Sequence, residues 1–494
     1  MIFSSPAFIF IFLPVAFLGY FYLNRRRLVV AGKAWLVVMS LAFYGYWSVI
    51  YLPLLVGSIL FNFAVGTHLI PVKTTADMSS SRRILLISGI TANLGLLSYF
   101  KYANFFIDNV NAAFDASFVL GQITLPLGIS FFTFTQIAYL VDSYRGEAKE
   151  YDFINYALFV TFFPHLIAGP ILHHREMMSQ FESRWTWVVR YRNVVLGMFI
   201  FSIGLFKKII IADTFSIWAN RGFDGGTKLD FVSAWSASLS YTMQLYFDFS
   251  GYCDMAIGAS LLFNIWLPLN FNSPYKALNI QDFWRRWHMT LSRFLRDYLY
   301  IPLGGNQCSE ARVYFNLMAT FLLGGLWHGA SWMFVIWGAL HGCALVVHRG
   351  WNAYGLRMPK AAAWLLTFGF VNVTWVFFRA KTFDDAARVL HGMVDVNSLF
   401  RLPIQSISTD SLAWGGIFSD RLVEVLPVAL VANLLCVAAI ALALAILGRK
   451  NSFEMLTAGS RQIDITLRRT IGLFVIALYP TVTTKSAVFL YYNF

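Results

Sequence analysis

Two long stretches without Asp, Glu, Lys or Arg constrain this chain most. Residues 34–72 run for 39 positions without a charged side chain, and residues 313–348 run for 36. A hydrocarbon core about 30 Å thick needs a helix of only about 20 residues. Each stretch must therefore turn. Pro53 predicts the turn in the first stretch, and Gly-Gly-Leu-Trp-His-Gly at residues 324–329 predicts it in the second.

The composition agrees with a polytopic membrane protein. Of 494 residues, 58% are hydrophobic and 13% are charged, whereas a soluble domain carries about 25% charged residues. This excludes an ordinary soluble enzyme, a disordered chain and a disulfide scaffold. Dividing the apolar residues by about 20 per crossing predicts an all-α bundle of about 10–14 membrane helices, with re-entrant and interfacial helices besides. No internal repeat or linker divides residues 1–494, so we expect one domain.

The net charge of +13 is interpreted as membrane topology rather than as a nucleic-acid partner. Basic residues cluster at positions 25–33 and again at 73–83, after two predicted crossings, so both clusters share one face. The positive-inside rule makes that face cytoplasmic and places the N-terminus outside. The apolar residues 1–24 are predicted to be a retained first span. The four cysteines are widely separated, so neither disulfides nor a metal site are expected.

Several further apolar stretches predict spans or breaks. In residues 153–172, Pro164 and Pro170 lie six positions apart and predict a broken or re-entrant element. The other predicted spans are residues 84–100, 118–141, 193–219, 361–378, 425–447 and 471–490.

Residues 273–312 have a different pattern. Apolar side chains recur there at the spacing of one helical face, and His288 falls on the opposite, polar face. This pattern predicts an amphipathic cytoplasmic helix lying in the interface. The basic side chains of the segment either follow the topology and contact phospholipid or line the entrance for an anionic substrate. They are Arg285, Arg286, Arg293 and Arg296.

His328 is the first candidate for chemistry. It lies at the glycine-rich break of residues 313–348, next to Trp327. A neutral imidazole at that depth can accept a proton at neutral pH, although a lone membrane histidine can equally be a core residue bonded between helices. Asp248 and Asp254 lie between two apolar segments and are consistent with an ion site, a substrate contact or a turn at the interface.

Three sequence strings together resemble the membrane-bound O-acyltransferase family, and within it the subfamily of alginate O-acetylation. They are Gln-Leu-Tyr-Phe-Asp-Phe-Ser-Gly-Tyr-Cys-Asp at residues 244–254, Phe-Trp-Arg-Arg-Trp-His-Met-Thr-Leu-Ser at 283–292 and Leu-Gly-Gly-Leu-Trp-His-Gly-Ala at 323–330. Shorter strings at residues 1–5, 99–104, 126–130, 163–170 and 207–213 are similar to the same subfamily.

The resemblance implies a helical bundle around a tunnel. It places the family's catalytic histidine at His328 and a second important polar position at His288. It implies no bound cofactor, acetyl-CoA as the acyl donor, and transfer across the membrane for O-acetylation of an exopolysaccharide, with alginate expected first. It also implies periplasmic acetyltransferase partner proteins and contact with membrane lipid.

Three other functions remain open at this point. They are O-acetylation of cellulose or another polysaccharide, D-alanyl transfer of the teichoic-acid type, and transport of acyl groups or lipid without chemistry. Acyl transfer needs a base for the acceptor hydroxyl and a site that excludes water, and a histidine in a narrow tunnel meets both needs.

Overall fold

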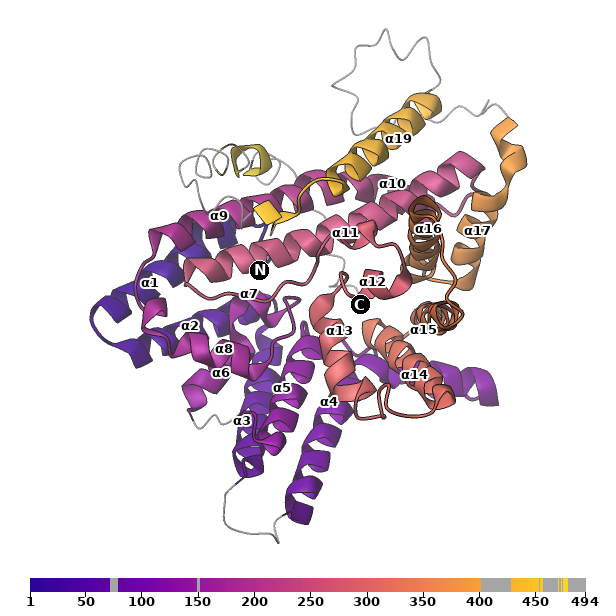
Figure 1. Ribbon diagram of the computed structural model, residues 1–494. Coiled ribbons are helices and arrows are strands. Elements are labelled where there is room, and N and C mark those ends of the chain that lie inside the picture. Colours follow the sequence, from indigo (N-terminus) through magenta and orange to yellow (C-terminus); the bar gives the residue numbers. More distant parts are fainter. Residues whose placement is uncertain are drawn as a thin grey trace.

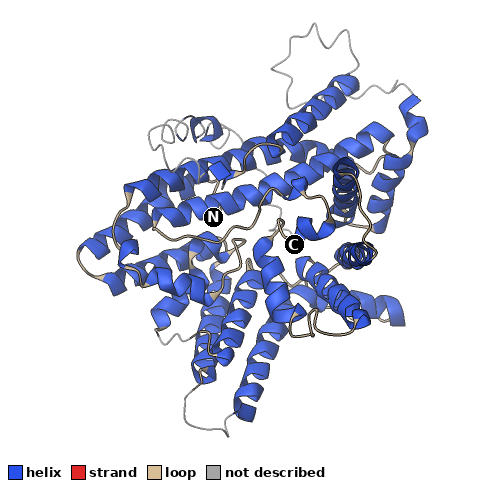
Figure 2. Ribbon diagram, viewed as in Figure 1, coloured by secondary structure: helices blue, strands red, loops and turns tan. Residues whose placement is uncertain are grey.

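The computed structural model describes residues 1–71, 79–148, 152–400 and 428–452, with a few further positions between 454 and 478. Every regular element in these residues is a helix, as Figure 2 shows. The prediction of an all-α protein is confirmed.

The N-terminal helices form one side of the molecule (Figure 1). They are a short π-helix (Phe8–Phe12), α1 (Leu13–Arg25), α2 (Val29–Gly45), α3 (Leu52–Leu69), α4 (Ser79–Phe114), α5 (Ile129–Arg145), α6 (Phe153–Thr161), α7 (Phe163–Leu166) and α8 (His174–Phe181). The turn predicted at Pro53 is confirmed, because this proline lies in the first turn of α3, where its missing N–H has no helical partner to lose. The break predicted within residues 153–172 is also confirmed between α6 and α7. The predicted span 118–141 is helical only from Ile129 onward.

A continuous rod and one long helix cross the centre of the molecule (Figure 1). The rod consists of α9 (Tyr191–Phe206), a π-helical turn (Lys207–Ala212) and α10 (Asp213–Asp224), and it packs along α11 (Phe231–Leu262). Of the three interpretations left open for Asp248 and Asp254, a turn at the interface is excluded, because α11 runs through both positions.

The two aspartates of α11 are held by lysines of the π-helical turn. Lys207 Nζ lies 2.6 Å from Asp254 Oδ2, and Lys208 Nζ lies 2.8 Å from Asp248 Oδ1. Lys208 also contacts Asp213 Oδ1 at 2.8 Å. Charges inside a membrane bundle must pair with one another, so these residues join α11 to the rod.

The predicted interfacial helix is broken into short pieces. The structure has α12 (Ile280–Trp284), α13 (Met289–Leu295) and a π-helical turn (Arg296–Tyr300) in its place. His288 separates the first two pieces with φ 43° and ψ 53°, a left-handed conformation that non-glycine residues seldom adopt. The register of the face therefore changes at this residue. His288 is fully buried, which corrects the prediction that it lies on the polar face.

The second charge-free stretch forms a tight hairpin of α14 (Glu310–His328) and α15 (Trp332–Ala353). The turn predicted at residues 324–329 is confirmed, and His328 is the last residue of α14. The two helices touch through Gly325 and Gly338, where an added Cβ would collide with main-chain atoms of the facing helix. Small residues at such contacts let two helices approach closely.

The remaining described helices are α16 (Lys360–Arg379), α17 (Phe383–Val394) and α19 (Val428–Leu447). Within the described residues, six helical segments are long and apolar enough to cross a membrane, and two shorter apolar helices accompany them. That number is smaller than the about 10–14 helices expected by dividing apolar residues by the span length. The predicted span 471–490 lies mostly outside the described residues.

Candidate active site

His328 lies in an aromatic cage at the end of α14. Its ring centroid is 5.0 Å from that of Trp327, 5.2 Å from Trp337 and 5.1 Å from Phe378. Only 3% of His328 is exposed. Rings that pack on several sides fix the orientation of the imidazole and exclude bulk water from it.

Two cavities meet at His328. The larger has a volume of about 540 Å³, and its lining includes Trp284, Arg285, Thr320, Trp337 and His328. The volume is in the range of ordinary small-molecule sites. Its walls carry both aromatic side chains and arginines, which suits a ligand with an apolar arm and a negatively charged end.

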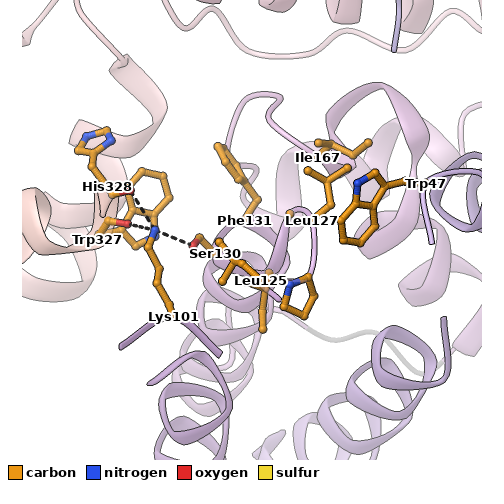
Figure 3. Close-up of a pocket in the computed structure, with 12 residues that line it drawn as sticks. Trp47, Lys101, Leu125, Leu127, Ser130, Phe131, Ile167, Trp327 and His328 are labelled. Atoms are coloured by element: carbon orange, nitrogen blue, oxygen red, sulfur yellow. Dashed lines mark hydrogen bonds between the residues drawn. The ribbon is translucent and has the colours of Figure 1, made fainter. Parts of the chain in front are cut away.

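The smaller cavity has a volume of about 80 Å³ and lies on the other side of the Trp327–His328 main chain. Figure 3 shows Lys101 and Ser130 beside that main chain, with Leu125 and Trp47 further along the lining. The imidazole of His328 points away from these residues, so this cavity meets the main-chain side of His328.

The two cavities have linings that differ in their distance along the chain from the basic clusters. Helix α2 begins within the basic cluster at residues 25–33 and ends at Gly45, so Trp47 lies just past the end of the helix that is remote from this cluster. Helix α4 likewise starts beside the second basic cluster and ends at Phe114. The two ends meet where Tyr51 Oη donates to the carbonyl of Thr124 at 2.9 Å. The smaller cavity therefore faces away from the basic clusters.

The larger cavity lies on the side of the basic clusters. Arg82 donates to the carbonyl of Tyr144 at 2.8 Å, and the neighbouring Arg145 guanidinium lies 5.8 Å from the Tyr298 ring centroid. Tyr298 follows Arg293 and Arg296 in the chain, and both of these arginines line the cavity. This chain of contacts links the cavity to the second basic cluster.

His288 is the second polar group of the site. Its ring centroid is 6.4 Å from that of His328 and 6.2 Å from that of Trp327. His288 Nδ1 lies 3.0 Å from Asn270 Oδ1. The same oxygen accepts from the main-chain N–H of Thr290 at 3.3 Å, and a peptide N–H can only donate. Asn270 Oδ1 is therefore an acceptor, so His288 Nδ1 carries a proton and the neutral ring presents a basic Nε2.

His341 shows what a structural histidine looks like in this bundle. Trp284 Nε1 donates to His341 Nδ1 at 3.2 Å. Thr374 donates its hydroxyl proton to the carbonyl of Val371, so its oxygen accepts from His341 Nε2 at 3.0 Å. The two ring nitrogens of His341 therefore hold α15 to α12 through Trp284 and to α16 through Thr374.

The four predicted arginines are not equivalent. Arg293 makes a two-pronged pair with Glu176 at 2.6 and 3.0 Å, and Arg296 pairs with Asp297. Arg286 pairs with Asp282 and does not line the larger cavity. Arg285 is exposed at the cavity and makes no ion pair within the part of the chain that the structure describes. Asp248 and Asp254 line neither cavity and are engaged by Lys208 and Lys207.

A buried histidine that lines two cavities, inside a helical bundle with segments long enough to cross a membrane, is an arrangement expected of a membrane enzyme. The model of MBOAT, the membrane-bound O-acyltransferase family, matches residues 17–383. The chain therefore belongs to this family and is a multi-pass membrane acyltransferase, which decides against transport without chemistry.

The relatives of this chain include proteins named as O-acetyltransferases of different polymers. A peptidoglycan O-acetyltransferase of Helicobacter pylori is 53% identical over 429 residues, which cover 81% of each chain. A probable alginate O-acetylase AlgI of Pseudomonas aeruginosa is 43% identical and covers 80% of this chain and 75% of its own length. A teichoic acid D-alanyltransferase of Bacillus subtilis is 29% identical over 52% of this chain and 69% of its own.

Sequence reasoning did not assign three residues to the site, namely Lys101 and Tyr102 beside His328 and Asn270 beside His288. Lys101 could have been found from the sequence, because it is the one charged side chain in residues 84–107. An ionisable side chain inside a membrane span is a candidate functional residue. Asn270 could not have been found in this way, because its role depends on where the loop before α12 folds.

Proposed function

We propose that this protein moves acetyl groups from acetyl-CoA in the cytoplasm to the hydroxyl groups of a glycan outside the membrane. The observation that carries the proposal is that His328 lines two separate cavities, which we propose open toward opposite faces of the membrane. The acceptor hydroxyl is proposed to pass from the smaller cavity, at the main-chain side of His328 (Figure 3), to the imidazole, which the donor reaches from the larger cavity. Donor and acceptor then do not share an entrance. The proposed orientation puts the basic clusters in the cytoplasm and the N-terminus in the periplasm of a bacterial inner membrane.

The proposed reaction is a single acyl transfer with His328 as the base. The imidazole takes the proton of the acceptor hydroxyl, the hydroxyl oxygen bonds to the thioester carbonyl carbon, and the carbon–sulfur bond breaks. The imidazolium then returns its proton to the departing thiolate, so coenzyme A leaves as a free thiol. The aromatic cage keeps water away from the thioester during this exchange.

The donor is proposed to enter through the larger cavity. Its apolar walls suit the pantetheine arm. Among the described residues, Arg285 is a guanidinium at this cavity without an ion pair, so it is available for the phosphates of coenzyme A. Guanidinium groups bind phosphate through paired N–H donors. Since Arg285 is exposed, its contribution is reduced by solvent screening.

Replacing Arg285 with Gln is expected to raise the KM for acetyl-CoA by about 3- to 10-fold, in line with a partly exposed charged hydrogen bond. The kcat should stay near that of the wild type, because Arg285 holds the donor and not the reacting atoms. Arg286→Gln is the matched control, since that neighbour does not line the cavity. Initial rates at varied acetyl-CoA measure both constants. Equal KM values for wild type and Arg285→Gln would remove Arg285 from the donor site.

The acceptor is proposed to be peptidoglycan, with alginate as the second candidate. The relative that acetylates peptidoglycan is 53% identical, and the alginate relative is 43% identical. The smaller cavity, about 80 Å³, suits a hydroxyl group at the tip of a chain rather than a polymer. This size favours delivery through periplasmic acetyltransferase partner proteins.

The acceptor is tested by measuring ester-bound acetate in cells with and without the gene. Alkali-released acetate is measured separately from purified peptidoglycan and from exported polysaccharide. The proposal expects peptidoglycan acetate to fall to background on deletion and to return with the wild-type gene. Loss confined to exported polysaccharide would favour the alginate type of acceptor, and unchanged acetate in both polymers would overturn the proposal.

A further inference from the structure

The last carbonyl groups of α14 need hydrogen-bond donors from outside the helix. An α-helix leaves its final carbonyls without intrahelical partners. In α14 these belong to Leu326, Trp327 and His328, because the chain becomes extended at Gly329 with φ −166° and ψ 152°. Trp327 and His328 are buried, with 4% and 3% of their surfaces exposed. Unpaired carbonyls at such a place would be costly.

Two adjacent residues of α4 supply the missing donors. Lys101 Nζ lies 2.5 Å from the carbonyl oxygen of Trp327 and 3.0 Å from that of His328. Tyr102 Oη donates to the carbonyl of Leu326 at 2.8 Å. Figure 3 shows the Lys101 ammonium reaching the main chain between Trp327 and His328. A cation at this end of a helix also opposes the negative end of the helix dipole.

The same face of α4 holds the beginning of α15. Asn109 Oδ1 accepts from Trp332 Nε1 at 2.8 Å, and the Phe105 ring packs against the Trp332 ring at 6.0 Å. Helix α4 therefore contacts the α14–α15 turn on both sides of His328.

Lys101 lines the smaller cavity, but the partners of its ammonium group are protein atoms. An ammonium group has three N–H donors. Two go to the carbonyls of α14, and the third faces Ser130 Oγ at 3.4 Å. All three protons are thus directed at protein atoms, and the Trp327 ring covers the group at 5.8 Å.

We propose that Lys101 is a positioning residue, which with Tyr102 fixes the main chain of His328 at the junction of the two cavities. This inference rests on the proposed function only in its kinetic consequence. A catalytic imidazole displaced by about 1 Å can lose about 10²-fold in rate. Lys101 does not line the larger cavity, so donor binding should not depend on it.

The kinetic test compares Lys101→Met, Lys101→Arg and Tyr102→Phe with the wild type. We expect Lys101→Met to lower kcat by about 10- to 100-fold with an unchanged KM for acetyl-CoA. Lys101→Arg should recover most of that loss, because a guanidinium can also donate to two carbonyls. Tyr102→Phe removes one cap and should lower kcat less. Lys33→Met is the matched control, since Lys33 donates to Asn155 in a different part of the bundle.

A second measurement does not require activity. Amide hydrogen exchange in residues 326–331 should quicken by about tenfold in Lys101→Met, because a helix end without its caps frays. Exchange in α9 and α11 should stay as in the wild type. If Lys101→Met does not fold, kcat and amide hydrogen exchange are measured on Tyr102→Phe instead.

The outcomes separate this inference from the proposed function. Wild-type kcat together with wild-type exchange in Lys101→Met or, where that variant does not fold, in Tyr102→Phe would overturn the positioning role. So would an equal loss in Lys101→Met and Lys33→Met. If the wild-type protein turns over no acetyl-CoA, the proposed function fails, and hydrogen exchange still decides the role of Lys101.

Discussion

Replacing His328 with Ala is expected to lower the rate of acetyl transfer by about 10²- to 10⁴-fold, the usual contribution of a general base. The effect should fall on kcat, because the imidazole acts on the acceptor proton in the transition state. The KM for acetyl-CoA should change little, since many other residues line the donor cavity. Release of coenzyme A thiol by detergent-purified protein measures the rate.

His341→Ala and His348→Ala are the comparison variants. His341 is bonded at both ring nitrogens, so its loss should lower the melting temperature more than the kcat of the folded fraction. His348 lies one turn from the end of α15 and contacts Asn352, so its loss should change neither. A His328→Ala enzyme as fast as His348→Ala would remove His328 from the chemistry.

Replacing Asn270 with Ala is expected to lower kcat by about 10- to 100-fold through misplacement of His288. The Asn270 side chain fixes the proton of His288 on Nδ1 and also accepts the Thr290 hydroxyl at 3.0 Å. Without it, the imidazole can rotate and exchange its tautomer, so its basic Nε2 no longer has one direction. The left-handed main chain at His288 would also lose a neighbouring support.

Two variants make the Asn270 result specific. Asn270→Asp keeps an acceptor for the Nδ1 proton and should retain more activity than Asn270→Ala. Asn272 lies two residues away on the same loop, where its side chain is exposed and contacts Asn451. The Asn272→Ala variant should therefore have the kcat of the wild type. The steady-state kcat of each variant is measured at matched amounts of folded protein. Full activity in Asn270→Ala would show that the tautomer of His288 is unimportant.

The sequence predicts much of the fold because membrane helices obey length and charge rules. The turn at Pro53 and the hairpin at His328 both follow from stretches too long for one crossing. The same rules applied to the lysines at 207 and 208 would have predicted ion pairs with Asp248 and Asp254, since buried charges in a bundle require partners. When these residues are treated separately, a turn stays among the three interpretations of Asp248 and Asp254.

The interior of the site was less predictable. Helical periodicity placed His288 on a polar face, but the left-handed conformation of His288 changes the helical register at this residue. No sequence pattern in residues 280–298 predicts that conformation. The cap on α14 joins Lys101 to residues more than 220 positions later. Such a contact depends on how α4 packs against the hairpin, which a sequence without its fold does not reveal.

The most direct test of acyl transfer between two faces uses sealed, inside-out membrane vesicles that contain the wild-type protein or His328→Ala. Radiolabelled acetyl-CoA is added outside, where it meets the cytoplasmic face, and ester-bound label is measured inside. We predict label in the lumen for the wild type, background for His328→Ala, and background for right-side-out vesicles given the same donor. Wild-type accumulation of esterified label by the His328→Ala vesicles would contradict the account.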